Sequence, residues 1–423
     1  MTTMPGEAFA GVPAAAGPRR SQARAATEPP EPPEDGFGPS VQRLLRLLRT
    51  TVGMKIAWTS EFLGSEQVFR FVDAAPDAGA GVPRPGTALP LSGAYCSRVI
   101  DGTMPAAITD TSTDPSAVLL PVTFDMHIGS YLGVPLRSAD GAVEGMLCAV
   151  SPSSSPSLSD ADVTSARLIA DVIDDIHRRE LAAVAARRRR DALRRLVRRL
   201  CRGTGRQLVV QAIVDLMSGE EVGVEALTRF DDVERSPAEW FATAQSLGLG
   251  TALEVAAAAS ALRSVPADAT HALSINLSPE AILDGALDEL LGGRDHRGVI
   301  VEVTEHAPIA SYEALEDALR PHRERGVRIA VDDVGAGYAS MTHVLRLRPD
   351  LVKIDMSLVH GLDGDPVRRA LVSAITGLAE QIGADVVAEG VETTGEREAL
   401  VGLGVRLGQG YLFQRPTPVP TAA

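Results

Sequence analysis

Polar side chains that can bind metal ions stand where successive apolar runs end in the second half of the chain. A single carboxylate in such a place is more often solvated or ion-paired, and a single lysine more often forms a salt bridge. Five or more carboxylates gathered in one cleft, however, repel one another unless cations neutralise them. The residues of this pattern are Glu225, Asn276, Glu302, Asp332 with Asp333, Lys353 with Asp355, Glu389 with Glu392, and Gln409.

The metal ligands in this pattern would all be oxygen atoms, because the pattern includes neither cysteine nor histidine. Oxygen-only donors favour Mg²⁺ or Mn²⁺ over zinc. There are enough carboxylates for two ions, one ligand being shared. A pair of ions can activate a water and stabilise the charge that grows on phosphate oxygens during in-line attack on a phosphodiester. The pattern therefore predicts metal-assisted phosphodiester chemistry.

A Gly-Ala-Gly sequence at positions 335–337 follows the two adjacent aspartates. It lacks the rest of a P-loop or a dinucleotide-binding fingerprint. We therefore interpret these glycines as a sharp turn over the metal site and not as a phosphate cradle.

Strand-like and helix-like segments alternate from about Gln207 onward, and they would position these side chains. Near-continuous apolar strands alternating with helices predict a parallel sheet covered on its outside. About eight such strands favour a TIM-like (β/α)8 barrel, in which the carboxyl ends of the strands meet on one face. The expected strands are residues 208–216, 223–230, 272–278, 298–305, 328–335, 350–355, 385–392 and 405–413.

The first half of the chain has a different organisation. Residues 1–37 are rich in proline, alanine and glutamate and predict a disordered tail. Residues 38–180 predict an α+β domain that opens with an amphipathic helix and contains a hairpin turning at Asp140-Gly141. A long helix is expected to begin near Ala161, and its basic part, residues 181–205, would connect to a second domain at 206–423.

The connecting helix contains the arginine-rich sequence RRRRDALRRLVRRLCR. Its arginines predict a solvated outer face, with contact to nucleic acid or membrane as the alternative. Its apolar stripes could pack against a neighbouring helix, and a parallel helix pair in a homodimer would cover both stripes.

Composition limits the classes of function. The formal net charge of −14 argues against general nucleic-acid binding, but it is compatible with a small anionic ligand held through metal ions. No apolar run is long enough to span a bilayer, and no signal peptide is evident at the start of the sequence. Cys96, Cys148 and Cys201 show neither metal nor disulfide spacing, which predicts a reducing, cytoplasmic location.

Seven motifs now identify a resemblance. GVEALTRF, INLSPE, VEVTE, VDDVGAGYAS, LVKIDMSLV, VAEGVET and GQGYLFQRP occur between about Gln207 and Pro418 in the order seen in EAL-domain cyclic di-GMP phosphodiesterases. The resemblance covers about half of the chain. It implies a TIM-like barrel with one reversed strand, hydrolysis of cyclic di-GMP to linear pGpG, two Mg²⁺ or Mn²⁺ ions per site and dimerisation through the EAL domain.

The resemblance also implies a role for each matching residue. Ligands of the first metal would be Glu225, Asn276, Glu302 and Asp332. Asp332 would bridge to a second metal with the help of Asp333. Lys353 would position or deprotonate the attacking water, and Glu389 and Gln409 would act close to the metals. The remaining residues would be Gln211, Leu227 and Arg229 on the substrate and Glu305 as the anchor of the loop after Asp333.

Some positions depart from the pattern of the family. Val334, Ala336 and Ala339 replace phenylalanine, threonine and serine. In the family this loop couples metal binding to dimerisation, so it is the implied coupling that the changes put in doubt. Ala212 replaces a proline, and Gln245 replaces a glutamate. None of the implied metal ligands is lost.

Residues 38–180 resemble a GAF domain. The sequences YCSRVIDGTMPAAITDTSTDP and IGSYLGVPLRSADGAVEGMLCAVS carry this resemblance, which indicates the fold but not the ligand. Cys96 could be a small buried residue, a chromophore attachment site or a redox thiol, and His127 could bind haem.

These observations lead to three functional hypotheses. The first is an active phosphodiesterase that the GAF domain modulates through the connecting helix. The second is a catalytically inactive receptor that binds cyclic di-GMP without cleaving it. The third, compatible with the first, is an interaction protein that dimerises through its GAF domain and helix. No cyclase motif of the GGDEF type is present.

Overall fold

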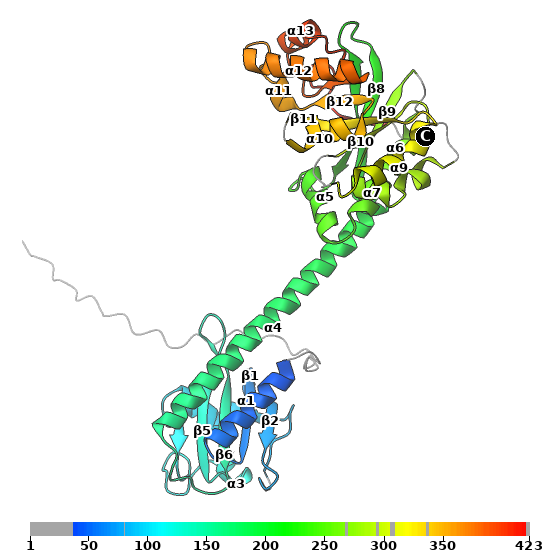
Figure 1. Cartoon of the computed structure of the whole chain (residues 1–423). Coiled ribbons are helices and arrows are strands. Elements are labelled where there is room, and N and C mark those ends of the chain that lie inside the picture. The colour runs from blue at the N-terminus through cyan, green and yellow to red at the C-terminus, as the bar shows by residue number, and fades with distance from the viewer. Residues whose placement is uncertain are drawn as a thin grey trace, which may run out of the picture. The chain divides into compact units, whose positions relative to one another are not determined.

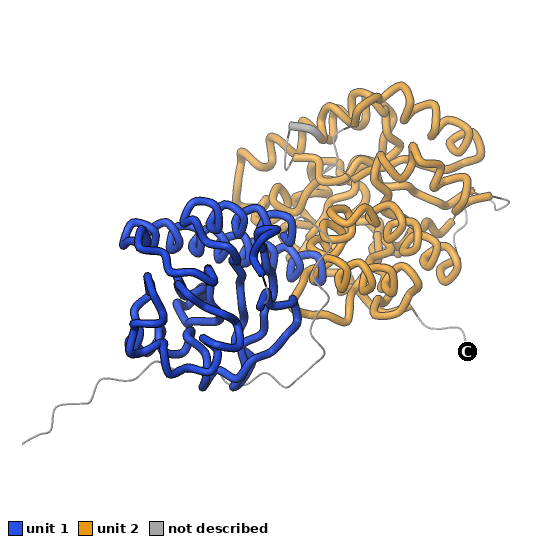
Figure 2. Tube along the Cα trace, turned by 90° about the horizontal axis from the view of Figure 1, so that it is seen from below, with its two compact units in different colours: residues 1–188 blue, residues 189–423 orange. Residues whose placement is uncertain are grey.

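The protein is described here by a computed structural model. It describes residues 37–79, 81–266, 270–292, 296–304, 309–335 and 338–419. Almost all of the tail predicted at residues 1–37 therefore lies outside the described residues. The chain divides into two compact units, residues 1–188 and 189–423 (Figure 2).

The first unit contains an antiparallel six-stranded sheet in the order β3-β2-β1-β6-β5-β4. The expected hairpin joins β5 to β6, and Gly141 adopts a positive φ of 84° in its turn. The strands are β1 (Ile56–Leu63), β2 (Glu66–Ala74), β3 (Ala88–Pro90), β4 (Ala107–Ile108), β5 (Ser130–Arg137) and β6 (Val143–Ser151).

Alternating side chains of this sheet build two separate cores, because successive residues of a strand point to opposite faces. Ala57 and Leu147 pack under α1 (Phe37–Thr51) and the first part of α4, which lie along one face (Figure 1). Their neighbours Trp58 and Cys148 pack on the other face. That second face is covered by η1 (Leu91–Gly93), α2 (Tyr95–Ile100) and α3 (Pro121–Asp125). The first unit is thus an α+β domain.

Helix α4 (Asp160–Cys201) is continuous over 42 residues, and the division between the two units falls inside it. Its early residues, such as Val163 and Ile173, belong to the core of the first unit. Near its end, Val197 and Leu200 pack on Trp240 in the second unit. Residues 187–190, all arginine, are exposed, as expected for a solvated face. No helix among the described residues is long and apolar enough to cross a membrane.

The second unit contains a closed eight-stranded barrel. Its strands follow the order β14-β13-β12-β11-β10-β9-β8-β7, and pairing of β14 with β7 closes the ring. β7 is antiparallel to both neighbours, whereas all the other pairs are parallel. This confirms a TIM-like barrel with one reversed strand. The strands are β7 (Arg206–Asp215), β8 (Glu221–Phe230), β9 (Ala272–Leu277), β10 (Val299–Val303), β11 (Arg328–Val334), β12 (Leu351–Ile354), β13 (Asp385–Ala388) and β14 (Leu407–Gly408), and β15 (Thr417–Pro418) adds to β7.

Helices surround the barrel, and several begin at side-chain caps. Capping boxes at Ser236 and Thr393 satisfy the first amides of α5 and α13, and Asp365 caps α12. The helices are α5 (Pro237–Ser246), α6 (Gly250–Ser264), α7 (Pro279–Leu283), α8 (Ala286–Leu291), α9 (Tyr312–Arg323), α10 (Tyr338–Leu347), α11 (Met356–Val359), α12 (Pro366–Ile382) and α13 (Thr394–Gly402).

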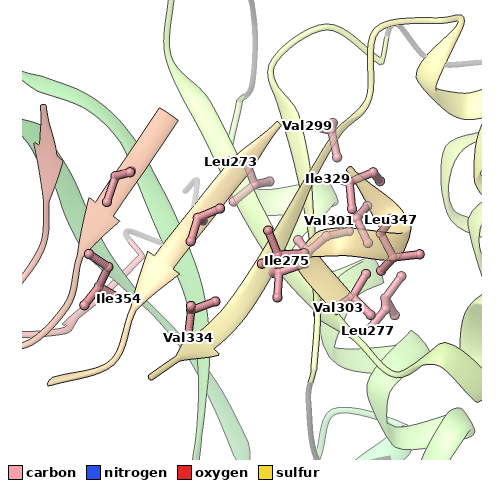
Figure 3. Close-up of a cluster of buried hydrophobic side chains, with 14 of the residues drawn as sticks. Leu273, Ile275, Leu277, Val299, Val301, Val303, Ile329, Val334, Leu347 and Ile354 are labelled. Atoms are coloured by element: carbon pink, nitrogen blue, oxygen red, sulfur yellow. The ribbon is translucent and has the colours of Figure 1, made fainter. Parts of the chain in front are cut away.

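Two apolar layers lie on either side of the barrel wall. One set of alternate strand residues, including Ile275, Val301 and Ile329, packs outward against the helices (Figure 3). The other set points into the barrel and forms a compact plug. The plug consists of Ile213, Ala272, Ile300, Ala330, Leu351, Val387 and Leu407. The barrel interior is therefore closed by side chains, and any site must lie above the plug.

Candidate active site

The inward-facing positions change from apolar to polar toward the carboxyl ends of the strands. Side chains two residues apart on a strand share one face. The residue two positions after each plug residue therefore also points inward, one layer nearer the carboxyl end of the strand. Ile300 is followed by Glu302 and Leu351 by Lys353. The same step leads from Ala330 to Asp332, from Val387 to Glu389 and from Leu407 to Gln409. Side chains from distant segments thereby form one polar layer.

Lys353 lies at the centre of this layer and is only 1% exposed. Its Nζ atom is 2.5 Å from Glu389 Oε1 and 2.8 Å from Glu302 Oε2. It is also 3.0 Å from Asp332 Oδ1 and 3.5 Å from Glu225 Oε2. One ammonium therefore faces four carboxylates. When all are ionised, negative charge is left in excess at a site that is largely shielded from water.

This excess of negative charge, together with burial, shifts the pKa values of the cluster. Burial, reinforced by the Glu225 carboxylate, holds the pKa of Glu302 well above its usual range. Burial, reinforced by Asp332, raises the pKa of Glu389 to about 8. Burial opposes the charge on Lys353, but the four carboxylates outweigh it and raise the pKa of the ammonium well above normal. The metal-free cluster thus retains protons that additional cations would replace.

Neutral side chains fix the orientation of the carboxylates. Glu225 accepts hydrogen bonds from Asn276 Nδ2 at 3.1 Å and from Gln409 Nε2 at 2.7 Å. Gln409 Nε2 is also 3.2 Å from Glu389 Oε1. The buried Ser274 hydroxyl donates to Glu302 Oε1 at 2.5 Å. Each of these carboxylates therefore has at least one oxygen that is held in place before any ligand arrives.

A bulge brings both adjacent aspartates into the cluster. The pairing of β11 with β12 shifts between Val331 and Val334, so that Asp332 and Asp333 both bring a carboxylate oxygen close to Glu389. Asp333 adopts φ 54°, which is in the left-handed region that aspartate tolerates better than most residues. Oxygens of Asp332, Asp333 and Glu389 consequently lie within 4.8 Å of one another. In a regular strand, the two aspartates would point to opposite faces.

The donor set fits divalent cations. The oxygens of Asp332, Asp333 and Glu389 are close enough to share an ion, and all are ligands that Mg²⁺ and Mn²⁺ prefer. Asp332 Oδ1 and Gln409 Oε1 are buried and, among the described residues, receive no hydrogen bond of acceptable geometry, although Asp332 Oδ1 lies 3.0 Å from the Lys353 ammonium. A buried acceptor without a donor is costly. A bound cation or a water that it holds would satisfy both atoms.

The other described residues that the resemblance implies lie on β7 and β8. Gln211 on β7 is paired with Glu225 across the antiparallel ladder, and its Nε2 donates to the Gln414 carbonyl at 3.1 Å. Leu227 and Arg229 follow Glu225 at alternate positions of β8, and Arg229 is exposed. Glu305 lies outside the described residues.

Two acidic residues of the sequence pattern are not part of the cluster. Asp355 accepts a hydrogen bond from the Ser357 amide at 3.0 Å and caps α11. Glu392 lies 3.9 Å from His360 Nε2. Both follow a strand end, but the chain has already turned away from the barrel axis. Conversely, Ser274 was not predicted, although its position two residues before Asn276 on an inward face was a usable signal.

The loop after Asp333 is described only in part. Val334 is fully buried in the outward-facing core. Ala336 and Gly337 lie outside the described residues, and the side chain of Ala339 is not described. Gly335 has φ 111°, and a Cβ atom there would lie 2.2 Å from Leu358 Cδ1. The turn therefore requires glycine at this position.

Substitution Gly335→Ala is expected to destabilise the protein by about 1–3 kcal/mol through backbone strain. The loss should be visible as a lower unfolding midpoint in urea. Combining Gly335→Ala with Leu358→Ala removes the side-chain clash but keeps the unfavourable φ, so part of the loss should remain. Full recovery in the double variant would show that the backbone conformation is not strained.

Comparisons with known proteins agree with this geometry. The family described as EAL domain matches residues 176–416, more than half of the chain, and the GAF domain matches residues 39–174. A cyclic di-GMP phosphodiesterase of Pseudomonas aeruginosa is 34% identical over 229 residues, which cover 50% of this chain and 38% of that protein. An Escherichia coli protein named as a probable cyclic di-GMP phosphodiesterase is 32% identical over 221 residues, covering 49% and 43%. The chain thus spans less than half of either relative.

A solved structure supports the fold over a larger part of the chain. The EAL enzyme Bd1971, in a form bound to cAMP and cyclic di-GMP, aligns with a TM-score of 0.51 and 19% identity. The alignment covers 86% of this chain and 91% of that one. The family match agrees with the closed barrel, its one reversed strand and the polar layer around Lys353. The chain therefore belongs to the EAL-domain family, and a GAF domain precedes its EAL domain.

Proposed function

We propose that this protein is a metal-dependent phosphodiesterase that hydrolyses cyclic di-GMP to linear pGpG. The observation that carries the proposal is the cluster of four carboxylates within 3.5 Å of the buried Lys353 ammonium at the carboxyl end of the barrel. Cyclic di-GMP has two anionic phosphodiester groups, which this cluster would repel without added cations. Both the substrate and the site therefore favour metal dependence.

We assign two Mg²⁺ or Mn²⁺ ions to the site. Glu225, Asn276, Glu302 and Asp332 would hold the first, and Asp332 with Asp333 would hold the second. When bound, these ions supply activation of water and stabilisation of charge on the phosphate. This assignment is supported by the donor chemistry, by the proximity of the Asp332, Asp333 and Glu389 oxygens, and by the buried Gln409 Oε1, which receives no hydrogen bond from the described residues.

The protein's own side chains would position the reactants. Lys353 is protonated in the metal-free cluster, so it can orient an attacking water by donating to its oxygen. Gln409 joins Glu225 to Glu389 and can hold a water through its free carbonyl oxygen. The exposed Arg229 can reach a substrate phosphate. Leu227 offers an apolar face, and Gln211 offers an amide for the guanine.

Substitution Ser274→Ala tests whether the Ser274 hydroxyl holds the Glu302 carboxylate in place for metal binding. Removal of the hydroxyl frees one oxygen of Glu302, so turnover should fall by about 10–100-fold, as for other groups that orient a metal ligand. The metal concentration that gives half-maximal activity should rise in parallel. Ser274→Thr keeps the hydroxyl and should retain more activity. Equal activity of the alanine variant and the wild type at limiting metal would contradict this role.

Metal removal provides the direct test of the proposal. Full-length protein treated with EDTA should lose turnover of cyclic di-GMP, and excess Mg²⁺ or Mn²⁺ should restore it. The same titration separates an enzyme from a receptor. Binding of cyclic di-GMP that persists in EDTA, with no product after metal is restored, would support the inactive receptor instead.

Regulation, assembly and location are further parts of this proposal. We propose that residues 38–180 act as a GAF sensory domain and that residues 181–205 transmit its state to the EAL domain at 206–423. Such transmission requires a helix with two packings of similar energy. We also propose a homodimer through the connecting helix and EAL domain, and a cytoplasmic location. Deletion of residues 1–180 should change turnover if the GAF domain regulates it.

A further inference from the structure

Two cysteines that are far apart in the sequence lie side by side in the GAF domain. Cys96 on α2 and Cys148 on β6 have their sulfur atoms 3.8 Å apart. Their exposed fractions are only 3% and 0%. The sequence spacing gave no sign of this pair, because the sheet and the helix that covers it bring the two residues together.

The surroundings of the two thiols are not equivalent. Cys96 lines a small cavity of about 20 Å³. Aromatic and apolar side chains, including Trp58, Phe69 and Tyr131, form most of its wall. Cys148 is not among the described residues that line the cavity. Its sulfur lies behind Cys96, 3.6 Å from the Tyr131 hydroxyl.

This arrangement assigns an order to any oxidation. Burial holds the pKa of the Cys148 thiol well above its usual range, so this thiol stays protonated and is a poor first nucleophile. Cys96 faces the cavity and would be the first thiol to meet a small oxidant that enters it. Cys148 is then placed to react with the oxidised Cys96.

We propose that Cys96 and Cys148 are a redox modification site that a small peroxide converts to an intradomain disulfide. In the first step, the Cys96 sulfur attacks one peroxide oxygen and the O–O bond breaks. The other peroxide oxygen leaves as water with the proton of the Cys96 thiol, and Cys96 becomes a sulfenic acid. In the second step, the Cys148 sulfur displaces the hydroxyl group from Cys96. This group leaves as water with the Cys148 proton, so two thiols are oxidised and one peroxide is reduced.

The required movement is small. A disulfide has an S–S distance of about 2.05 Å, so the two sulfurs must approach by less than about 2 Å. Cys148 lies in β6, which is held by β1 and β5 on its two sides. Cys96 lies in a short helix of six residues, and a change in its rotamer with a small shift of this helix can provide the approach. Because both thiols are buried and apolar surroundings slow such reactions, the reaction should take minutes and not milliseconds.

Trp58 offers an optical reporter of the modification. It pairs with Cys148 across the β1–β6 ladder and lines the same cavity. The chain contains one other tryptophan, Trp240, which lies in the barrel unit. A disulfide beside Trp58 should lower the emission of that tryptophan, and Trp58→Phe should remove the signal.

The experiment uses the reduced, full-length protein and hydrogen peroxide as the probe. After graded exposure, the reaction is quenched in acid, and the thiols are alkylated in denaturant and mapped by mass spectrometry. We expect the loss of two of the three thiols together, in a cross-linked pair of peptides that contain Cys96 and Cys148. Cys201 should stay reduced and therefore be alkylated after the quench. Treatment with dithiothreitol before alkylation should make all three cysteines alkylatable again.

Variants test the order of the steps. Cys148→Ala should stop at a Cys96 sulfenic acid that dimedone traps, whereas Cys96→Ala should leave Cys148 reduced. Cys201→Ser is the matched control and should form the disulfide as the wild type does. The proposal fails if Cys96 and Cys148 remain alkylatable after Cys201 is oxidised. Linkage of either cysteine to Cys201 would overturn it equally. Both outcomes are read from the wild type, so they do not depend on the folding of a variant.

Discussion

Replacement of Lys353 by methionine is expected to reduce turnover of cyclic di-GMP by about 10²–10³-fold, the range for losing one donor that stabilises the reacting groups. Methionine has similar length but no charge. The variant therefore removes the donor at the centre of the cluster while leaving the carboxylates in place. Steady-state hydrolysis at saturating metal measures the effect, which should appear in kcat.

The same substitution should also change stability. Without the ammonium, two buried and two partly buried carboxylates face one another, and breaking a buried ion pair costs about 3–5 kcal/mol. Urea unfolding in EDTA should show this loss, and Mn²⁺ should recover part of it by supplying positive charge.

Lys55→Met is the matched control for this variant. Lys55 lies 2.6 Å from Asp77 in an exposed ion pair, so its replacement should change stability by less than about 1 kcal/mol and leave turnover unchanged. If the Lys353→Met variant kept the kcat of the wild type, Lys353 would have no role in the reaction.

Asp332→Asn is expected to have an effect of similar size. It removes one negative charge from the oxygen group shared with Asp333 and Glu389, and Asn presents one oxygen where Asp presents two. Turnover should fall by about 10²–10³-fold, as when a charge-stabilising group is removed. The affinity for Mn²⁺ should fall by at least about 10-fold. Titration of Mn²⁺ by calorimetry separates the loss of binding from the loss of chemistry.

Asp355→Asn is the control for Asp332→Asn. The strand-end pattern in the sequence also includes Asp355, which follows a strand and lies two residues after Lys353, although the family resemblance gives it no role. In the structure it caps α11 through the Ser357 amide, and asparagine caps as well as aspartate. Turnover, metal affinity and stability should therefore stay close to those of the wild type. A loss at Asp355 as large as that at Asp332 would contradict the assignment of the two residues.

Much of the site could be predicted from the sequence because barrel strands obey a simple rule. Apolar residues fill the plug, and the inward position two residues later carries the polar group, as Ile300 and Glu302 show. Given the order of strands, this rule places residues from distant segments in one layer. The strand alternation did not predict that Asp332 and Asp333 both lie close to Glu389, because a bulge and a left-handed residue depend on tertiary pairing.

Other features depend on contacts that no local pattern encodes. Ser274 supports Glu302 from a neighbouring strand, and Cys96 meets Cys148 across two layers of the GAF domain. Gln245, which stands where relatives have glutamate, donates to Glu280 Oε2 at 2.8 Å. A glutamate there would place two carboxylates together. Such pairs follow from the assembled fold and not from spacing in the sequence.

Product analysis tests the central claim most directly. Full-length protein is incubated with cyclic di-GMP and Mn²⁺ in water enriched in ¹⁸O. The nucleotides are then separated, and their masses are measured by mass spectrometry. We expect linear pGpG that carries one ¹⁸O atom in its phosphate, with no product in EDTA and far less from Asp332→Asn. Intact cyclic di-GMP after prolonged incubation of metal-loaded, substrate-bound wild-type protein would contradict it.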